Sequence, residues 1–228
     1  MPYNNHIQSN VRISRNTLIL LLFFVFFSGG YAVAEEIPDN AFFALEEADS
    51  AVHEVADWIV NSGDNKSMPF VIVDKKQGKI YVFREEGVIS AAAPALIGET
   101  IGDYSAPGVG DKKLCDINPY ERTTPAGRFL GRRGLNSDGT EVIWIDFDTA
   151  IAIHAIPSSN PGKRQQQRLI SPSYKDKRIT LGCVNVSKDF YIKIITPLFS
   201  RQNAFVYILP ETIPVQEFFK FKVANSGI

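Results

Sequence analysis

Cys183 and His154 are the two residues whose types can do chemistry together. Cys183 stands in "RITLGCVNVS", Arg178 to Ser187, between a glycine and an apolar Val-Asn-Val run. A cysteine attacks as the thiolate, and since a free thiol has a pKa of ~8.5, it needs a base or a positive field near neutral pH. His154 ends the apolar run "AIAIH" and is the candidate base. This pair is a candidate for acyl transfer through a cysteine nucleophile, and the alternative is two cysteines that are simply buried or disulfide-bonded.

The residues around the cysteine bear on this hypothesis. Gly182 permits close backbone approach, so the N–H groups of Gly182 and Cys183 are candidates to face a developing oxyanion. Cys115 is the other cysteine of the chain, and in an oxidising compartment a Cys115–Cys183 disulfide would silence the nucleophile. The alternatives therefore stay open: a free Cys115, a redox partner, a structural bridge or a link to another chain. His53 is expected to be a half-exposed helix residue.

The first 34 residues have the pattern of a secretory signal. Arg12 and Arg15 precede the apolar run "TLILLLFFVFF", Thr17 to Phe27, and "SGGYAVA" follows, ending at Ala34. The apolar run is short for a membrane span, which needs roughly 20 residues. An uncleaved N-terminal anchor is the alternative, and we expect membrane contact only through this segment. In either case the working part of the chain is expected outside the cytoplasm.

Composition limits the classes of function. The chain is 45% hydrophobic and 21% charged, as in an ordinary globular protein, and its 228 residues suffice for one medium domain or two small ones at most. With 24 basic and 25 acidic residues it has no electrostatic footprint for nucleic acid. Its few histidines and cysteines do not make a convincing metal site, so we expect no metal. We expect no organic cofactor either.

Hydrophobic periodicity predicts a mainly β chain with an added N-terminal helix. Apolar residues at helical spacing predict an amphipathic helix over residues 41–62, with Asp39 or Asn40 as its cap and Gly63 after its end. A polar linker, 62–69, follows. A second helix is expected over about 187–198, with Ser187 as its cap and Pro197 near its end, and "VQEFFKF" in the tail predicts one more short helix.

Short apolar or alternating runs predict the strands, with turns at glycines between them. Between residues 98 and 129 lies a long Gly- and Pro-rich stretch, and a loop of that length in a compact domain is usually functional. The predicted strands cover 70–74, 79–84, 87–98, 142–147, 150–154, 179–186 and 204–209.

"TLGCVN" after an upstream "IH" resembles the L,D-transpeptidase catalytic domain (YkuD-type), whose signature is a His followed later by Ser/Thr-x-Gly-Cys-x-Asn/Arg. "FVIVDKKQGKIYVF" resembles the opening hairpin of that domain, "RTTPAGRF" its Thr-Pro-x-Gly-x-Phe segment, and "GCVNVSKDFY" its nucleophile strand and following helix. In order, these motifs cover about residues 69–210. The resemblance implies a β-sandwich-like fold with one or two short helices. We therefore divide the chain into a signal peptide (1–34), a helix and linker (35–66), a catalytic domain (67–211) and a tail (212–228).

The resemblance also implies roles for particular residues. Cys183 would be the nucleophile, His154 the base, and the carbonyl of Ala155 the group that orients the imidazole. Two departures stand out: Leu181 replaces a second histidine of many members, and the gap between His154 and Cys183 is longer than usual. The extra stretch, 162–177, would be an insertion over the site, either a lid or a solvated loop.

Further residues are expected to meet the substrate. Asn185 alternates onto the strand face of Cys183. Arg122 and Arg128 are candidates for a substrate carboxylate, although surface ion pairs are the commoner fate of an arginine. The substrate-binding set is Thr124, Gly127, Arg128, Thr180 and Asn185.

The family implies an exported enzyme of the periplasm or cell-wall space that acts on peptidoglycan stem peptides, with a role in cell wall organisation and cell shape. Cys183 would form a thioester with release of D-Ala, and an acceptor amine from another stem peptide or from a cell-wall-anchored lipoprotein would resolve it. Two alternatives are a hydrolase of the L,D-carboxypeptidase or endopeptidase type with the same site, and a non-catalytic wall-binding module with a Cys115–Cys183 disulfide.

Overall fold

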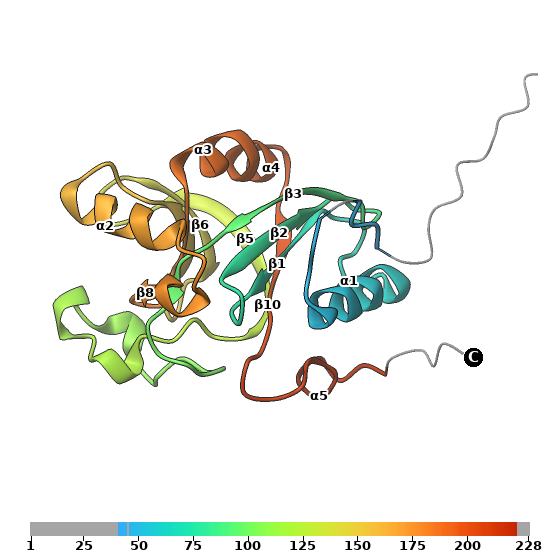
Figure 1. Ribbon diagram of the computed structural model, residues 1–228, viewed down its shortest axis with the longest axis horizontal. Coiled ribbons are helices and arrows are strands. Elements are labelled where there is room, and N and C mark those ends of the chain that lie inside the picture. Colours follow the sequence, from blue (N-terminus) through green and yellow to red (C-terminus); the bar gives the residue numbers. More distant parts are fainter. Residues whose placement is uncertain (1–40, 45, 223–228) are drawn as a thin grey trace, which may run out of the picture. The chain divides into compact units, whose positions relative to one another are not determined.

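A curled sheet of eight strands forms the centre of the computed structural model (Figure 1). The structure describes residues 41–44 and 46–222. The expected secretory signal, residues 1–34, therefore lies outside the described residues. Within the described part of the chain, no helix combines the length and the apolar character needed to cross a bilayer.

The strand order in the large sheet is β3-β2-β1-β10-β5-β6-β7-β9, and β4 pairs with β8 separately. Most neighbours are antiparallel, but β1 pairs with β10 and β7 pairs with β9 in parallel. The strands are β1 (Phe70–Asp74), β2 (Lys79–Phe83), β3 (Ile89–Pro94), β4 (Ile97–Gly98), β5 (Gly127–Leu135), β6 (Glu141–Asp146), β7 (Ile151–Ala155), β8 (Arg178–Thr180), β9 (Val184–Val186) and β10 (Ala204–Ile208).

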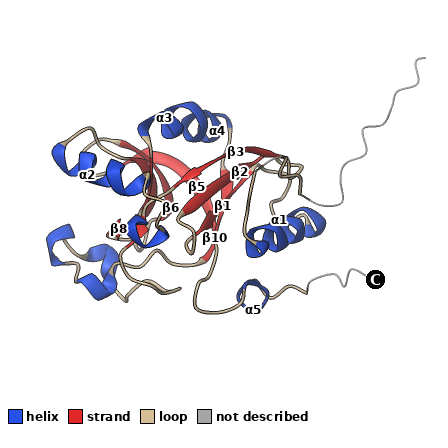
Figure 2. Ribbon diagram, in the orientation of Figure 1, coloured by secondary structure: helices blue, strands red, loops and turns tan. Residues whose placement is uncertain are grey.

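Helices cover the sheet and build the long connections (Figure 2). Among the described residues, the α-helices are α1 (Ser50–Ser62), α2 (Asn160–Leu169), α3 (Lys188–Phe190), α4 (Thr196–Arg201) and α5 (Val215–Phe219). The others are the 3₁₀ helices η1 (Val109–Asp111), η2 (Leu114–Asp116), η3 (Pro119–Glu121) and η4 (Tyr174–Lys177), and the π-helix η5 (Tyr191–Ile195).

Both faces of the central strand β1 are buried. Val71 and Val73 face one hydrophobic cluster, which also includes Tyr191 and Phe199 from the α3–α4 segment. The alternate residues Phe70 and Ile72 face a second cluster, together with the apolar side of α1. Since each face has its own cover, β1 is a continuous apolar run and does not alternate with polar residues.

The two edges of the sheet approach each other. The first cluster joins side chains of β2, the second strand from one edge, with side chains of β9, the strand at the other edge. After β3, the chain reaches the β9 edge, where Leu96 and Asn185 exchange backbone hydrogen bonds of 2.8 and 2.9 Å. The sheet is therefore nearly closed, and the prediction of a mainly β, sandwich-like domain with short helices is confirmed.

The N-terminal helix is shorter than the predicted range 41–62. Helix α1 begins at Ser50, and its cap is Asp49, whose carboxylate accepts from the Ala51 N–H. Upstream, Phe42 pairs with Val88 as an isolated bridge. Backbone pairing with that segment competes with helix formation, so the predicted caps are wrong. The predicted end is confirmed at Gly63, which has a φ of 65°.

Strand β5 was not predicted, although it is the longest strand of the sheet with nine residues. Its sequence "GRFLGRRGL" lacks the alternation of apolar and polar residues. The glycines lie under aromatic rings instead: a Cβ at Gly131 would meet Phe199 at 2.6 Å, and one at Gly134 would meet Trp144 at 2.7 Å. Because the glycines make room for aromatic rings of other elements, the packing of β5 is visible only in three dimensions.

The predicted helix over 187–198 is confirmed at its start and is wrong at its end. The Ser187 hydroxyl accepts from the Phe190 N–H, as expected of a cap. The helical segment continues to Arg201, and Pro197 lies in the first turn of α4. The preceding turn is π-helical, and such a wide turn leaves backbone groups unpaired, so a proline without an N–H fits there.

Candidate active site

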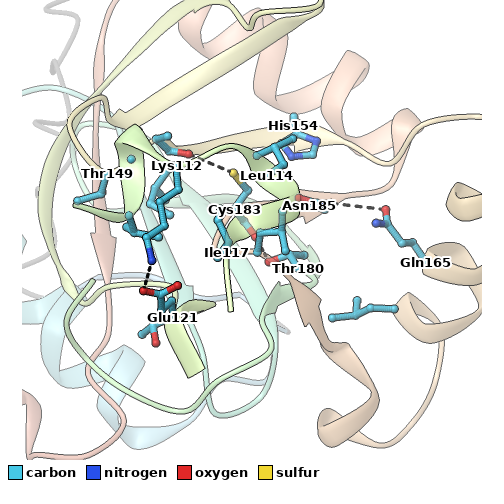
Figure 3. A pocket seen from close by; sticks show the side chains of 17 residues that line it. Lys112, Leu114, Ile117, Glu121, Thr149, His154, Gln165, Thr180, Cys183 and Asn185 are labelled. Atoms are coloured by element: carbon cyan, nitrogen blue, oxygen red, sulfur yellow. Dashed lines mark hydrogen bonds and ion pairs between the residues drawn. The ribbon is translucent and has the colours of Figure 1, made fainter. Parts of the chain in front are cut away.

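Cys183 and His154 line one pocket of about 280 Å³ (Figure 3). His154 is on β7 and Cys183 directly precedes β9, and these two strands are parallel neighbours. Their register sets His154 opposite Asn185. The pairing of β7 with β9 therefore brings residues that are far apart in the sequence to one pocket.

A hydroxyl-bonded turn holds the cysteine. The predicted strand over 179–186 is broken into β8 and β9 by this turn, in which Gly182 has a φ of 138°. The Thr180 hydroxyl accepts from the Gly182 N–H at 3.2 Å and donates to the Cys183 carbonyl at 2.7 Å. The Gly182 N–H is thus engaged inside the turn, which leaves the N–H of Cys183 as the candidate oxyanion donor.

The imidazole of His154 is oriented by the backbone. Its Nδ1 lies 3.2 Å from the carbonyl oxygen of Ala155. Because a carbonyl only accepts, this contact needs the proton on Nδ1, and Nε2 keeps its lone pair. Burial lowers the pKa of His154 from its ordinary value of 6.5, against the raising effect of the Ala155 contact. The ring is therefore neutral near pH 7, the state that a general base requires.

The thiol of Cys183 is also neutral in this arrangement. Burial raises its pKa above the ordinary 9.0, and a backbone contact with Ala152 opposes the shift. The Sγ atom donates to the carbonyl oxygen of Ala150 at 3.6 Å. Ala150 itself has a φ of 57°, so a strained turn presents this carbonyl. The thiol and the imidazole are therefore both neutral, and the resting site is not a thiolate–imidazolium ion pair.

Asn185 contributes an unpaired acceptor to the pocket. Its side chain is 3% exposed, and its Nδ2 donates to Oε1 of Gln165 at 3.5 Å. Its Oδ1 has no hydrogen-bond partner among the described residues. A buried amide oxygen without a partner is unusual, which indicates that it is available to a ligand.

The predicted insertion is not an irregular loop. Most of residues 162–177 belong to α2 and η4. Gln165 on α2 lines the pocket (Figure 3), whereas the basic residues of the same helix are not among the pocket-lining residues. The insertion therefore adds an amide to the site.

The long Gly- and Pro-rich segment builds the opposite wall of the pocket. Apolar side chains from η1 to η3 line it, including Leu114 and Ile117. Lys112 lies there too and pairs with Glu121 at 2.5 Å, which lowers the pKa of that carboxyl. Sequence reasoning missed these individual residues, although the length of the loop indicated a functional segment.

Three predicted substrate-binding residues are not among those that line this pocket: Thr124, Gly127 and Arg128. Arg128 pairs with Asp64 at 2.5 Å, and its guanidinium lies over the ring of Phe205 at 3.8 Å. Thr124 is 2% exposed and bonds to backbone groups. Thr180 and Asn185, the other two of the set, do line the pocket.

Two further side chains are engaged elsewhere. Arg122 has the surface ion pair that was the alternative to a substrate carboxylate, with Glu99 at 2.7 Å. His53 is half-buried on α1, and its ring lies on that of Phe43 with centroids 3.8 Å apart.

Both cysteines are free. Cys115 is exposed and its Sγ contacts Oδ1 of Asp116 at 3.6 Å. The disulfide that the binding-module alternative requires is thus not formed in this structure. Within the described ranges, no group of three or more His, Cys, Asp or Glu side chains gathers in a way that could hold a metal ion.

No family model matches the sequence, and no curated protein matches it. Several solved structures, however, are similar to this chain. The helical cell shape determining protein Pgp2 from Campylobacter jejuni is 18% identical with a TM-score of 0.42, and the match covers 64% of this chain and 49% of that one. An L,D-transpeptidase from Xylanimonas cellulosilytica is 19% identical, with a TM-score of 0.37 and coverage of 62% and 60%.

The catalytic domain of the Enterococcus faecium L,D-transpeptidase is 18% identical, with a TM-score of 0.34, and the match covers 63% of this chain and 98% of that domain. The chain matches about half the length of Pgp2. The structural neighbours thus include L,D-transpeptidases, the family whose motifs the sequence resembles, at a distant level of likeness.

Proposed function

We propose that the protein is an exported L,D-transpeptidase that acts on peptidoglycan stem peptides in the periplasm or cell-wall space. The observation that carries this proposal is the meeting of Cys183 and His154 in one pocket, with the imidazole oriented by the Ala155 carbonyl. The order of the motifs in the sequence supports the same family.

In the proposed reaction, Cys183 attacks the amide carbonyl between the third-position diamino acid and the terminal D-Ala. His154 takes the thiol proton at Nε2 and delivers it to the leaving nitrogen of D-Ala. An acceptor amine then attacks the thioester carbonyl and gives a proton to His154, and the thiol re-forms with the proton that the imidazole returns. The acceptor is an amine of another stem peptide or of a wall-anchored lipoprotein.

The neutral resting pair defines what the histidine must do. A thiol with a raised pKa is a weak nucleophile, so proton transfer has to accompany attack. The sulfur must first leave the Ala150 carbonyl and turn towards the imidazole. The N–H of Cys183 then stabilises the oxyanion of the tetrahedral intermediate, a contribution worth roughly 3 kcal/mol for one such donor.

Asn185 and Gln165 supply the polar side of the substrate site. The free Oδ1 of Asn185 is placed to accept an N–H of a peptide or an ammonium group. Thr180 serves the site indirectly, because its hydroxyl is used within the cysteine turn. The apolar loop wall suits the alkyl part of a diamino acid side chain.

The decisive experiment is mass spectrometry of the purified protein after incubation with a tetrapeptide-bearing muropeptide. A cross-linked dimer that has lost one D-Ala is the expected product, and Cys183→Ala should give none while retaining the melting temperature of the wild type. Cys115→Ser is the matched control, since it removes the exposed thiol and should leave turnover unchanged.

Other outcomes correct or overturn the proposal. A tripeptide without any dimer would show that water is the acceptor, and the protein would then be a hydrolase with the same site. No reaction by a folded wild-type protein, or equal turnover by Cys183→Ala, would contradict the catalytic assignment.

A further inference from the structure

Lys75 is a fully buried lysine outside the pocket. It directly follows β1, is 1% exposed, and donates three hydrogen bonds from its ammonium group. The acceptors are the carbonyl of Gly102 at 2.5 Å, Oδ1 of Asp103 at 2.8 Å and the carbonyl of Thr124 at 3.0 Å. An ammonium has three N–H groups, so each of them has a partner.

The surrounding charges compensate for its burial. The other oxygen of Asp103 accepts from the N–H and the hydroxyl of Thr212. Glu211 lies 3.6 Å from the Lys75 ammonium and pairs with Arg178. Buried charges persist only when they are paired and hydrogen-bonded in this way, so the cluster fixes its members in one arrangement.

Thr124 connects this cluster to the cysteine turn. While its carbonyl accepts from Lys75, its hydroxyl accepts from the Gly98 N–H at 2.8 Å and donates to the Gly182 carbonyl at 2.7 Å. The bonded carbonyl belongs to the residue directly before Cys183. Thr124 thus connects Lys75 to the cysteine turn: its carbonyl bonds the lysine and its hydroxyl bonds the turn.

Close packing leaves that turn little freedom to move. A Cβ on Gly182 would meet the carbonyl oxygen of Thr123 at 3.0 Å, and one on Gly98 would meet the Arg122 carbonyl oxygen at 2.4 Å. The segment around Thr124 is therefore pressed against both glycines. If it shifts, the turn before Cys183 has space to shift with it.

We propose that Lys75 and Thr124 are positioning residues that hold the Cys183 turn at the distance from His154 needed for proton transfer. This proposal rests on the proposed Cys–His site, because neither residue touches the pocket. The thiol needs its base within hydrogen-bond reach, and a displacement of about 1 Å can cost up to 10²-fold in rate. Loss of the Thr124 hydroxyl removes the bond to the Gly182 carbonyl and frees the turn.

The test measures alkylation of Cys183 by iodoacetamide as a function of pH, in a Cys115→Ser background so that one thiol reacts. If His154 assists, the wild type reacts at pH values well below the raised pKa of the thiol, as a shoulder in the profile. Thr124→Val, which keeps the shape of the side chain without its hydroxyl, should lower the rate in that shoulder by about tenfold. Thr124→Ser should restore it to within about twofold, since it keeps the hydroxyl.

Lys75→Met is the second variant, and it should also suppress the shoulder. If Lys75→Met does not fold, the Thr124 pair decides the question. Val55→Ala, in the other hydrophobic cluster, is the control for destabilisation alone: it should lower the melting temperature and leave the alkylation profile unchanged.

Two failures are distinguishable. A wild type with no shoulder, or a His154→Ala variant that keeps it, would overturn the Cys–His site itself. A shoulder that His154→Ala removes and Thr124→Val preserves would overturn only the positioning role, as would equal losses in Thr124→Val and Thr124→Ser.

Discussion

The two walls of the pocket are built in different ways. The strand wall holds His154 and Asn185 in fixed register between β7 and β9, and the cysteine turn is bonded at both of its carbonyls. The loop wall consists of short 3₁₀ helices, and Leu114 on it is 70% exposed. A regular ladder positions atoms more strictly than exposed turns do, so in the proposed reaction the strand wall carries the reacting groups and the loop wall is expected to contribute to substrate recognition.

Within the strand wall, the largest loss of turnover is expected from removing the imidazole of His154, the proposed general base. His154→Ala should reduce turnover by about 10²–10⁴-fold, since general acid–base assistance is lost. His53→Ala removes an imidazole that packs against the ring of Phe43, and it is the matched control that should keep full activity. Steady-state rates with the muropeptide check both variants. Equal activities in the two would erase the distinction between a catalytic and a packing histidine.

The pH dependence of kcat/KM also tests whether His154 is the catalytic base. Because burial lowers the pKa of His154, the acid limb of kcat/KM should lie below 6.5 and fall about tenfold per pH unit beyond it. An acid limb at or above 6.5 would contradict a buried neutral base.

The lowered pKa of His154 should also make the stability of the protein depend on pH. Between the folded and unfolded pKa values of His154 the unfolded chain binds more protons, so the free energy of unfolding should fall as the pH drops through 6.5. His154→Ala should remove that part of the pH dependence. Denaturant titrations at several pH values measure it.

Asn185 tests the polar part of the strand wall. Asn185→Leu removes the unpaired acceptor, and we expect KM to rise by about tenfold with a smaller change in kcat, because one substrate donor loses its partner. Gln165→Ala removes only the hydrogen bond from Nδ2 of Asn185, so it should raise KM less than Asn185→Leu does. An unchanged KM in Asn185→Leu would show that Oδ1 does not meet the substrate.

The loop wall should show the smallest effect. Leu114→Ser should lower kcat/KM by about threefold, because only part of an exposed side chain covers the substrate. Ile170→Ser is the control, since Ile170 is 72% exposed and does not line the pocket. A loss as large as that of His154→Ala would mean that the loop wall takes part in the chemistry.

Much of the strand wall could be predicted from the sequence. The apolar runs around His154 and Cys183 indicated strands, and the spacing of Asn185 placed it on the face of the cysteine. The break at Gly182 was missed because a glycine after a β-prone run does not by itself specify a φ of 138°. The hydroxyl bonds of Thr180 decide that geometry, and they join groups whose proximity depends on the turn.

Arg128 and Thr124 show why the substrate-binding set was predicted less well. A cationic or hydroxyl side chain near a motif suits a ligand and a structural partner equally. The choice depends on which groups lie within reach, and Arg128 meets Asp64, more than sixty residues earlier in the chain. The helix α2 was missed for a related reason, since its polar sequence has few apolar residues to reveal a period.

By itself the sequence identified the candidate nucleophile Cys183, its candidate base His154 and most of the strands beside them, because residue type and local periodicity can be read directly from the chain. The tertiary structure decided that the Thr124 hydroxyl bonds the carbonyl of Gly182, and that the buried Lys75 bonds the carbonyl of Thr124. Those are contacts between distant segments, and their strength depends on distance and burial, which exist only after the sheet has curled and closed.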